Sequence, residues 1–383
     1  MSKLPVGFDK SLWEDILFEA SRLGVLPMLY FSLQNAGILA DFPEEFVARC
    51  KESWRQTTLA NMRLLHDFSQ IALLFQAADI PIIALKGIYL ANHVYPHSGM
   101  RQMGDIDLLI PESDLPSARE ILFHLGYTQL DVVAYDNIQA EIEIAHHLAP
   151  FVKEGSPTIE LHWHIVKPGE GHYVFPAEEL WRRTVACQIG TSSTLALTRE
   201  ALLVHLCMHV SYHHLFAFGL RPLYDVHTLI SLYGDTLDWD EIASIGASWR
   251  VAAGIHLTLA VVQQLFGTPI PPHYQNADKI PGELLDTVIE QILADASDSH
   301  NLTLLAKLYS SGSVWERLGT GFKRIFVQPH PIFSRSYLRF LLARTARLFT
   351  LYQQDLLRLY GPKRDQALVD KATRYAKIYR WLK

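Results

Sequence analysis

The N-terminal part of the chain carries apolar residues at helical spacing. Two series show it: Trp13, Ile16, Leu17, Ala20 and Leu23, then Leu59, Met62, Leu65, Phe68, Ile71 and Leu74. Residues three or four positions apart share one face of an α-helix, which can then pack against a core. The pattern therefore predicts a helical region over residues 1–79.

After this region, short apolar runs replace the helical spacing. Ile80–Leu85 is closed by Lys86-Gly87, which is typical of a buried strand that ends in a turn. Asp105–Ile110 predicts a second strand, and the helical stripe that follows it ends at Gly126. Strand, turn, helix and strand in this order indicate a core that mixes helices with a sheet.

Two further segments predict an antiparallel hairpin. Glu141–Val152 and Thr158–Val166 flank the turn Glu154-Gly155-Ser156-Pro157, whose length suits a hairpin loop. After Pro176 helical spacing returns and dominates to the end, with a proline-rich linker at Gly267–Gly282. From the hairpin onward we therefore expect mainly helices.

These patterns together predict an α+β fold in which a small mixed β-sheet is flanked by N-terminal and C-terminal helical regions. The expected sheet core covers residues 80–176. A helical domain at 177–267 is expected to complete a cleft against the sheet, and a C-terminal helical region occupies 283–383.

Composition narrows the class of protein. Of the 383 residues 49% are hydrophobic and 19% charged, which excludes an intrinsically disordered chain. The three cysteines lie far apart, so neither a disulfide framework nor a thiolate zinc site is expected. The longest apolar stretch, Ile71–Leu85, is interrupted by polar residues and predicts no transmembrane helix. Because the first residues lack a signal-peptide pattern, we expect a cytoplasmic location.

The charge is unevenly distributed along the chain. From Arg335 to Lys383 there are twelve Lys or Arg and three Asp, a charge of +9, which leaves −15 for the preceding residues. One interpretation is a C-terminal helix packed on the acidic body with a solvated cationic face. The other is a tail that contacts an anionic partner, either a nucleic acid or a membrane surface.

Acidic residues on two of the predicted strands suggest a metal site. Asp105 and Asp107, two positions apart, project from the same face of a strand. Like charges this close repel unless a cation lies between them. If the later strand is a neighbour, Glu160 completes a cluster of three carboxylates, which suits Mg²⁺ or Mn²⁺. The alternative is a set of ordinary surface carboxylates at a strand edge.

Basic residues and a glycine near these acids suggest a place for phosphate. Lys86 and Arg101 can supply counter-charge, and Gly87 would let backbone N–H groups approach an anion at the start of a helix. Carboxylates that hold hard cations beside such a cradle are what metal-assisted phosphoryl transfer needs.

The ordered set Leu85-Lys86-Gly87, Tyr95-Pro96, Arg101, Asp105–Ile110, Leu125-Gly126-Tyr127 and Ile159–Trp163 resembles an uncharacterised bacterial nucleotidyltransferase family of the DNA polymerase beta-like superfamily. The similarity spans about Pro81 to Val166. It implies that Gly87 belongs to the strand-to-helix turn and that Asp105, Asp107 and Glu160 are the catalytic acids that bind the metal. Members commonly carry Gly-Ser or Gly-Gly at the turn, so here Lys86 would replace the missing serine hydroxyl.

The helical domain offers further candidates. His205, His209 and His213 recur every four residues, and the family's Leu-Arg-…-Asp pattern corresponds here to Leu220-Arg221 with Asp225. We expect His209, Arg221 and Asp225 to face the acids and contact the substrate, as His162 could from the sheet. The alternatives are a polar stripe bonded within a helical bundle and a zinc site.

The resulting hypothesis is a magnesium- or manganese-dependent enzyme that transfers a nucleoside monophosphate from a nucleoside triphosphate to an unknown acceptor. The alternative is a non-catalytic protein that keeps the fold and senses a nucleotide.

Overall fold

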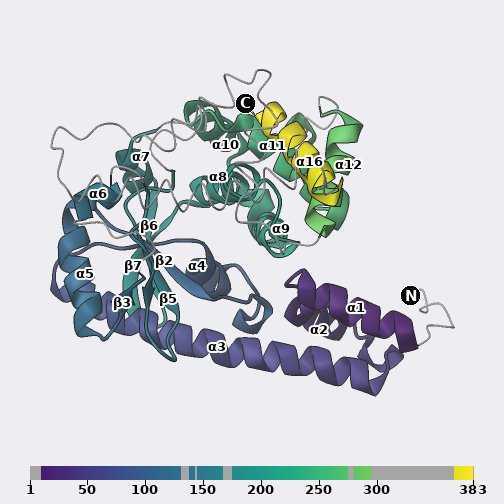
Figure 1. Ribbon diagram of the computed structural model, residues 1–383, viewed down its shortest axis with the longest axis horizontal. Helices are drawn as coiled ribbons and strands as arrows, with labels where there is room; N and C mark the ends of the chain where they lie inside the picture. Colours follow the sequence, from purple (N-terminus) through teal and green to yellow (C-terminus); the bar gives the residue numbers. More distant parts are fainter. Residues whose placement is uncertain are drawn as a thin grey trace.

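The computed structural model describes residues 10–130, 138–142, 145–166, 175–274, 280–294 and 366–382. Helices surround a seven-stranded sheet, which confirms the α+β class (Figure 1). The strands are β1 Ile83–Ala84, β2 Asp105–Leu109, β3 Thr128–Gln129, β4 Phe151–Val152, β5 Thr158–His162, β6 Thr184–Ile189 and β7 Ser192–Leu197. The helices are α1 Lys10–Arg22, α2 Leu26–Asn35, α3 Glu44–Ala77, α4 Lys86–His93, α5 Leu115–His124, α6 Ile138–Ile142, α7 Ala177–Arg182, α8 Arg199–Met208, α9 Arg221–Tyr233, α10 Trp239–Ser248, α11 Ala252–Phe266, α12 Gly282–Leu293 and α16 Gln366–Leu382.

The strands lie in the order β3-β4-β5-β2-β1-β7-β6. β2 pairs in parallel with β5, and β1 pairs in parallel with β7, whereas the other neighbours are antiparallel. The sheet is therefore mixed, and its two central acidic strands run in the same direction.

One face of the sheet is apolar and covered by α3 and α5. Alternate residues of the central strands, including Ile106, Leu108 and Leu161, are fully buried there. They pack with α3 residues such as Phe68 and Phe75. Figure 1 shows α3 running along the sheet and continuing beyond it to α1 and α2. Burial of this face fixes the pleat, so the intervening residues of each strand must point to the opposite side.

The opposite face turns toward the helices that follow the sheet in sequence. Ile83, Leu85 and Leu109 pack there in a core that includes residues of α8 to α12 and α16. Asp105 and Asp107 alternate with the buried residues of β2 and lie on this same face. The sheet therefore presents its acids toward α8 and the residues after it.

The segment 177–197 contains a hairpin that the sequence analysis missed. β6 and β7 pair antiparallel over their full length, and β7 extends the sheet beside β1. The expectation of helices after Pro176 is met by α7 but is wrong for β6 and β7, which continue the sheet past residue 176. Gly190 lies in the turn between the two strands and has a φ of 59°, a conformation that glycine adopts without strain.

The predicted strand Glu141–Val152 is also mostly wrong. Residues 138–142 form the short helix α6, and among the described residues of this segment the strand is Phe151–Val152, with an isolated bridge from His147 to His162. The hairpin itself exists, because Phe151 pairs antiparallel with Ile159. Its second strand ends at His162, shorter than the predicted end at Val166, because the chain then bends and the Trp163 N–H donates to the His146 carbonyl.

The described part of the basic C-terminal segment is packed on the body. α16 buries Ala372, Tyr375 and Ile378 against the helical core, and Lys377 Nζ lies 3.1 Å from Glu283 Oε2 of α12. This arrangement matches the first interpretation of the tail for residues 366–382. The preceding part of the basic segment, residues 335–365, lies outside the described residues.

Within the part of the chain that the structure describes, no single helix is long and apolar enough to cross a membrane. Residues 12–22 and 26–35 meet that test only as a pair, and the pair is bent by 117°.

Candidate active site

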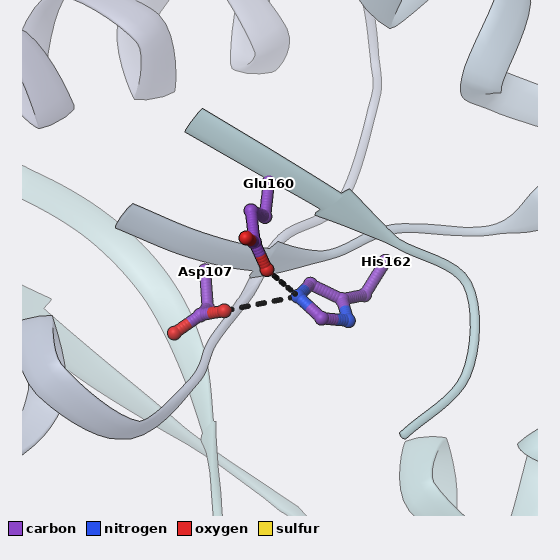
Figure 2. A group of neighbouring side chains, drawn as sticks. All are labelled: Asp107, Glu160 and His162. Atoms are coloured by element: carbon purple, nitrogen blue, oxygen red, sulfur yellow. Dashed lines mark hydrogen bonds and ion pairs between the residues drawn. The ribbon is translucent and has the colours of Figure 1, made fainter. Parts of the chain in front are cut away.

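The two acidic strands place Asp107 directly beside Glu160. β2 and β5 are parallel neighbours, and their register pairs Asp107 with Glu160 and Leu109 with His162. The side chains of Asp107, Glu160 and His162 converge on one face of the sheet (Figure 2). Alternation along each strand and the parallel register are thus enough to bring residues far apart in sequence into one cluster.

His162 bridges the two carboxylates. Its Nε2 lies 3.0 Å from Asp107 Oδ1 and 3.4 Å from Glu160 Oε2. One ligand atom from each of the three residues lies within 4.8 Å of the others, and no other such group occurs among the described residues. His162 is 3% exposed, so this cluster is formed largely out of solvent.

The ionisation of the cluster follows from these contacts. Burial raises the pKa of Asp107, but the Lys86 ammonium and the hydrogen bond from His162 outweigh burial and bring it below its usual value. The pKa of Glu160 is also lowered, because the His162 bond overcomes burial. Burial opposes the charged form of His162, yet the bonds to Asp107 and Glu160 raise its pKa. These directions favour ionised carboxylates on Asp107 and Glu160, which stabilise the protonated form of His162 between them.

Lys86 supplies a second cation at the same carboxylate. Its Nζ lies 3.1 Å from Asp107 Oδ1, and the side chain is 16% exposed. Burial disfavours the ammonium, but Asp107, Glu160 and Asp105 together raise the pKa of Lys86. The backbone of Lys86 has a φ of 41°, which is rare for a residue with a side chain and costs conformational energy. That strained turn aims the ammonium at the acids from the first residue of α4.

Asp105 lies on the same face but outside the three-residue group. It is the exposed first residue of β2. Although the residue as a whole is exposed, surrounding protein partly desolvates its carboxyl, and this desolvation together with the charge of Asp107 raises the pKa of Asp105. Of the expected cluster, Asp107 and Glu160 belong to the group whose ligand atoms lie within 4.8 Å of one another, and His162 is its third member.

The guanidinium of Arg101 is held by Asp225. Its Nε and Nη2 each donate to Asp225 at 2.8 Å, and the Tyr95 hydroxyl also donates to Asp225, at 2.7 Å. Arg101 and Asp225 are 8% and 3% exposed. Both were expected to contact phosphate or substrate, whereas here each is the partner of the other and joins the sheet to α9.

The ion pair between Arg101 and Asp225 requires a glycine at position 87. A Cβ at this position would lie 2.7 Å from Arg101 Nη1 and 3.2 Å from Met103 Sδ. The glycine, expected to let a phosphate approach the backbone, is thus needed for the close approach of Arg101.

Arg221 and His209 reach the site from the helical side. Arg221 begins α9 and donates from Nη1 to the Gln102 carbonyl at 3.2 Å, and burial and the nearby Arg101 lower its pKa. His209 Nε2 lies 3.5 Å from Lys86 Nζ and 3.0 Å from His214 Nε2. Burial and the Lys86 charge keep the pKa of His209 well below its usual value. Because the lowered pKa favours the neutral ring, His209 adds no positive charge beside the Lys86 ammonium.

A pocket between the sheet and the helices is lined by imidazoles. Its walls are Leu85, Lys86, His146, His162, Ile165, His205, His209 and His213. The spacing of four residues indicated the three helical histidines, but they do not form a metal group of their own among the described residues. Burial and the Lys86 charge lower the pKa of His205 to about 3. The sequence analysis considered His162 only as a substrate contact and did not predict that it bridges the acids.

The donor set fits a divalent cation. Two ionised carboxylates and one imidazole nitrogen from converging side chains suit Mn²⁺, and carboxylates also suit Mg²⁺. The Nδ1 of His162 is buried without a hydrogen-bond partner, which leaves Nε2 as the nitrogen engaged with the acids.

The fold and the site together define an α+β protein with a mixed sheet, an acidic and histidine-containing centre on one face, and a helical layer that closes the pocket. A family described as uncharacterised nucleotidyltransferase matches residues 9–267, more than half of the chain. The chain belongs to this family. No curated protein and no solved structure matches it significantly.

Proposed function

We propose that this protein transfers a nucleoside monophosphate from a nucleoside triphosphate to an acceptor, with the help of Mg²⁺ or Mn²⁺. Family membership supports the reaction class. The observation that carries the proposal is the convergence of Asp107, Glu160 and His162 beside the Lys86 ammonium. The order Lys86-Gly87, Asp105, Asp107 and Glu160 supports a place in the polymerase beta-like superfamily.

Asp107, Glu160 and His162 would hold the metal. A bound divalent cation supplies charge neutralisation and orientation for the triphosphate. Lys86 adds a permanent positive charge 3.1 Å from Asp107, where the negative charge of the phosphates would gather. Arg101 and Asp225 act as positioning residues, because their ion pair keeps the Gly87 turn against α9.

In the reaction the acceptor oxygen forms a bond to the α-phosphorus, the bond from that phosphorus to the bridging oxygen breaks, and pyrophosphate leaves. The acceptor hydroxyl must lose its proton during this step. Asp105 is suited to receive it, since it is the exposed acid on this face and its pKa is raised. A nucleoside triphosphate is thus the donor, and a group able to expose a hydroxyl or phosphate oxygen to Asp105 is the acceptor.

The test is pyrophosphate release from each nucleoside triphosphate with Mg²⁺ or Mn²⁺ and a cell extract that supplies the acceptor. Asp107→Asn and Glu160→Gln are expected to lower turnover about a hundredfold, because each removes a carboxylate ligand of the divalent cation that neutralises the triphosphate. Glu120→Gln, at an exposed position on α5, is the matched control and should keep full turnover. Unchanged turnover in Asp107→Asn would contradict the proposal.

One observation favours the alternative of a non-catalytic nucleotide sensor. Lys86 and His162 both contact Asp107 Oδ1, so the carboxylate is already neutralised by cations of the chain itself. A sensor would bind nucleotide on Lys86 and release no pyrophosphate with any acceptor. Binding without product over a broad acceptor screen would therefore support the sensor over the enzyme.

We place this activity in the cytoplasm, where the donor nucleotides are formed. The described end of the basic tail, α16, is packed against α12. A contact between the tail and an anionic partner is therefore proposed for residues 335–365 alone.

A further inference from the structure

A line of side chains leads from the acidic centre to the surface. Lys86 Nζ lies 3.5 Å from His209 Nε2, which lies 3.0 Å from His214 Nε2, and the His214 ring centroid is 4.0 Å from that of Phe218. Exposure rises along this line, from 16% for the Lys86 side chain to 46% for Phe218. A large aromatic ring is therefore displayed to solvent within four contacts of Asp107.

The backbone that presents Phe218 is strained and anchored. α8 continues into a π-helical turn, His209–His213, after which Leu215 and Phe216 have φ values of 47° and 61°. Such left-handed conformations in residues with side chains cost free energy and persist where the surroundings hold them. Leu215 and Phe216 are 1% and 2% exposed, so both strained residues are buried while Phe218, two positions after Phe216, is exposed.

The end of the segment is fixed as well. Gly219 has a φ of 68° and lies against the backbone of Leu23, where an added Cβ would come within 3.1 Å of the Leu23 carbonyl. The Phe216 N–H donates to the Val210 carbonyl at 2.9 Å. The orientation of Phe218 is therefore set by a built turn and not by a free loop.

We propose that Phe218, supported by His214, is the surface on which the base of the donor nucleotide stacks. This inference rests on the proposed function and extends it to nucleotide recognition. If the phosphates lie at Lys86 and the acids, the ribose and base of the same molecule extend outward along the line of His209 and His214. Every nucleobase has an aromatic face, so stacking on a phenyl ring binds bases with little sequence preference.

The occupant follows from continuity with the site. An aromatic ring joined by direct contacts to a phosphate-facing lysine matches a ligand that is anionic at one end and flat and aromatic at the other. Binding of a protein partner or of a second copy of the chain would require only the exposed ring. It would not account for the contacts that connect Phe218 through His214 and His209 to Lys86.

The experiment separates the base from the phosphates. The dissociation constants of ATP, GTP, CTP and UTP, and of inorganic tripolyphosphate as the base-free probe, are measured calorimetrically with Mn²⁺. Phe218→Ala is expected to weaken the four nucleotides about tenfold and to leave tripolyphosphate unchanged. Phe218→Trp should restore or improve nucleotide binding. Phe123→Ala, which removes a 39% exposed phenyl ring from α5, is the matched control.

Several results would overturn the inference. Equal nucleotide affinity in Phe218→Ala and wild type would do so, as would equal loss of nucleotides and tripolyphosphate that Phe218→Trp does not restore. A change of oligomeric state in Phe218→Ala with unchanged nucleotide affinity would assign the ring to a protein contact instead. If wild type bound neither nucleotides nor tripolyphosphate, the proposed function itself would fail and the stacking surface with it.

Discussion

Arg101 and Asp225 form a bidentate ion pair, with both bonds at 2.8 Å, that connects the loop before β2 to α9. The pair is buried, and Tyr95 completes the hydrogen bonding of the carboxylate. Its partners belong to segments that the sequence analysis placed in different domains. The pair therefore fixes the helical layer against the sheet face that carries the acids.

Removal of one partner of this pair should destabilise the fold strongly. Asp225→Ala leaves the Arg101 guanidinium buried without a counter-charge, which costs about 3–5 kcal/mol of unfolding free energy. Arg101→Met with Asp225→Leu should cost less than either charge removed alone, because no isolated ion remains. Urea unfolding followed by circular dichroism measures the loss of unfolding free energy in Asp225→Ala, in Arg101→Met and in the double variant. A mild loss, below about 1 kcal/mol, in Asp225→Ala would show that the pair contributes little.

Gly87→Ala should be destabilising for a steric reason. The new methyl group would meet Arg101 Nη1 at 2.7 Å, and Arg101 cannot yield because Asp225 holds it. Overpacking of this kind costs about 1–3 kcal/mol. Gly104→Ala is the control, since a Cβ there has nothing within 4 Å. Equal unfolding midpoints for the two variants would contradict the role given to Gly87.

Lys86 competes with a metal for Asp107. Lys86→Met removes the ammonium from Asp107 Oδ1 and should strengthen Mn²⁺ binding by about tenfold in the absence of nucleotide, because two cations no longer repel at one carboxylate. The same variant should bind nucleotide more weakly. Titration calorimetry with Mn²⁺ alone and with ATP separates the effects, and Lys86→Arg, which keeps the charge, is the control. Weaker Mn²⁺ binding in Lys86→Met would show that Lys86 does not compete with Mn²⁺ for Asp107.

His205 should make the fold less stable in acid. Its pKa is about 3 in the folded protein because burial excludes the charged form, whereas an unfolded imidazole titrates near 6.5. Between pH 6.5 and pH 3 the imidazole is protonated in the unfolded chain but not in the folded chain. The free energy of unfolding therefore falls by about 1.4 kcal/mol for each pH unit of acidification in this range. His205→Gln should reduce that slope. Urea unfolding from pH 6.5 to pH 4 measures it, and an identical slope in the variant would show that His205 protonates freely when folded.

The sequence predicts what depends on local pattern. Alternation along β2 correctly placed Asp105 and Asp107 on one face of the sheet. The β6–β7 hairpin escaped prediction because its strands are partly polar and lie between helical segments. Local pattern also could not show that β5 lies beside β2 in parallel, because strand order depends on the whole chain.

The site was predictable only in part for the same reason. Glu160 and Asp107 are paired, as the hypothesis of neighbouring strands required. The partner of Arg101 was not foreseeable, because Asp225 is 124 residues away and no spacing rule connects them. The bridging position of His162 depends on where β5 ends and on the His146–His147 segment that packs beside it.

The imidazole of His162 should set the metal preference of the site. A nitrogen ligand beside two carboxylates favours Mn²⁺ over Mg²⁺, which takes oxygen ligands almost exclusively. We expect wild type to bind Mn²⁺ at least about tenfold more tightly than Mg²⁺. His162→Gln offers an amide oxygen in place of Nε2 and should narrow this ratio by weakening Mn²⁺ binding more than Mg²⁺ binding. His164→Gln, two residues along and bonded to the Phe175 carbonyl, is the control. Calorimetric titration with each metal gives the ratio, and a ratio unchanged by His162→Gln would mean that the metal is held by the carboxylates without the histidine.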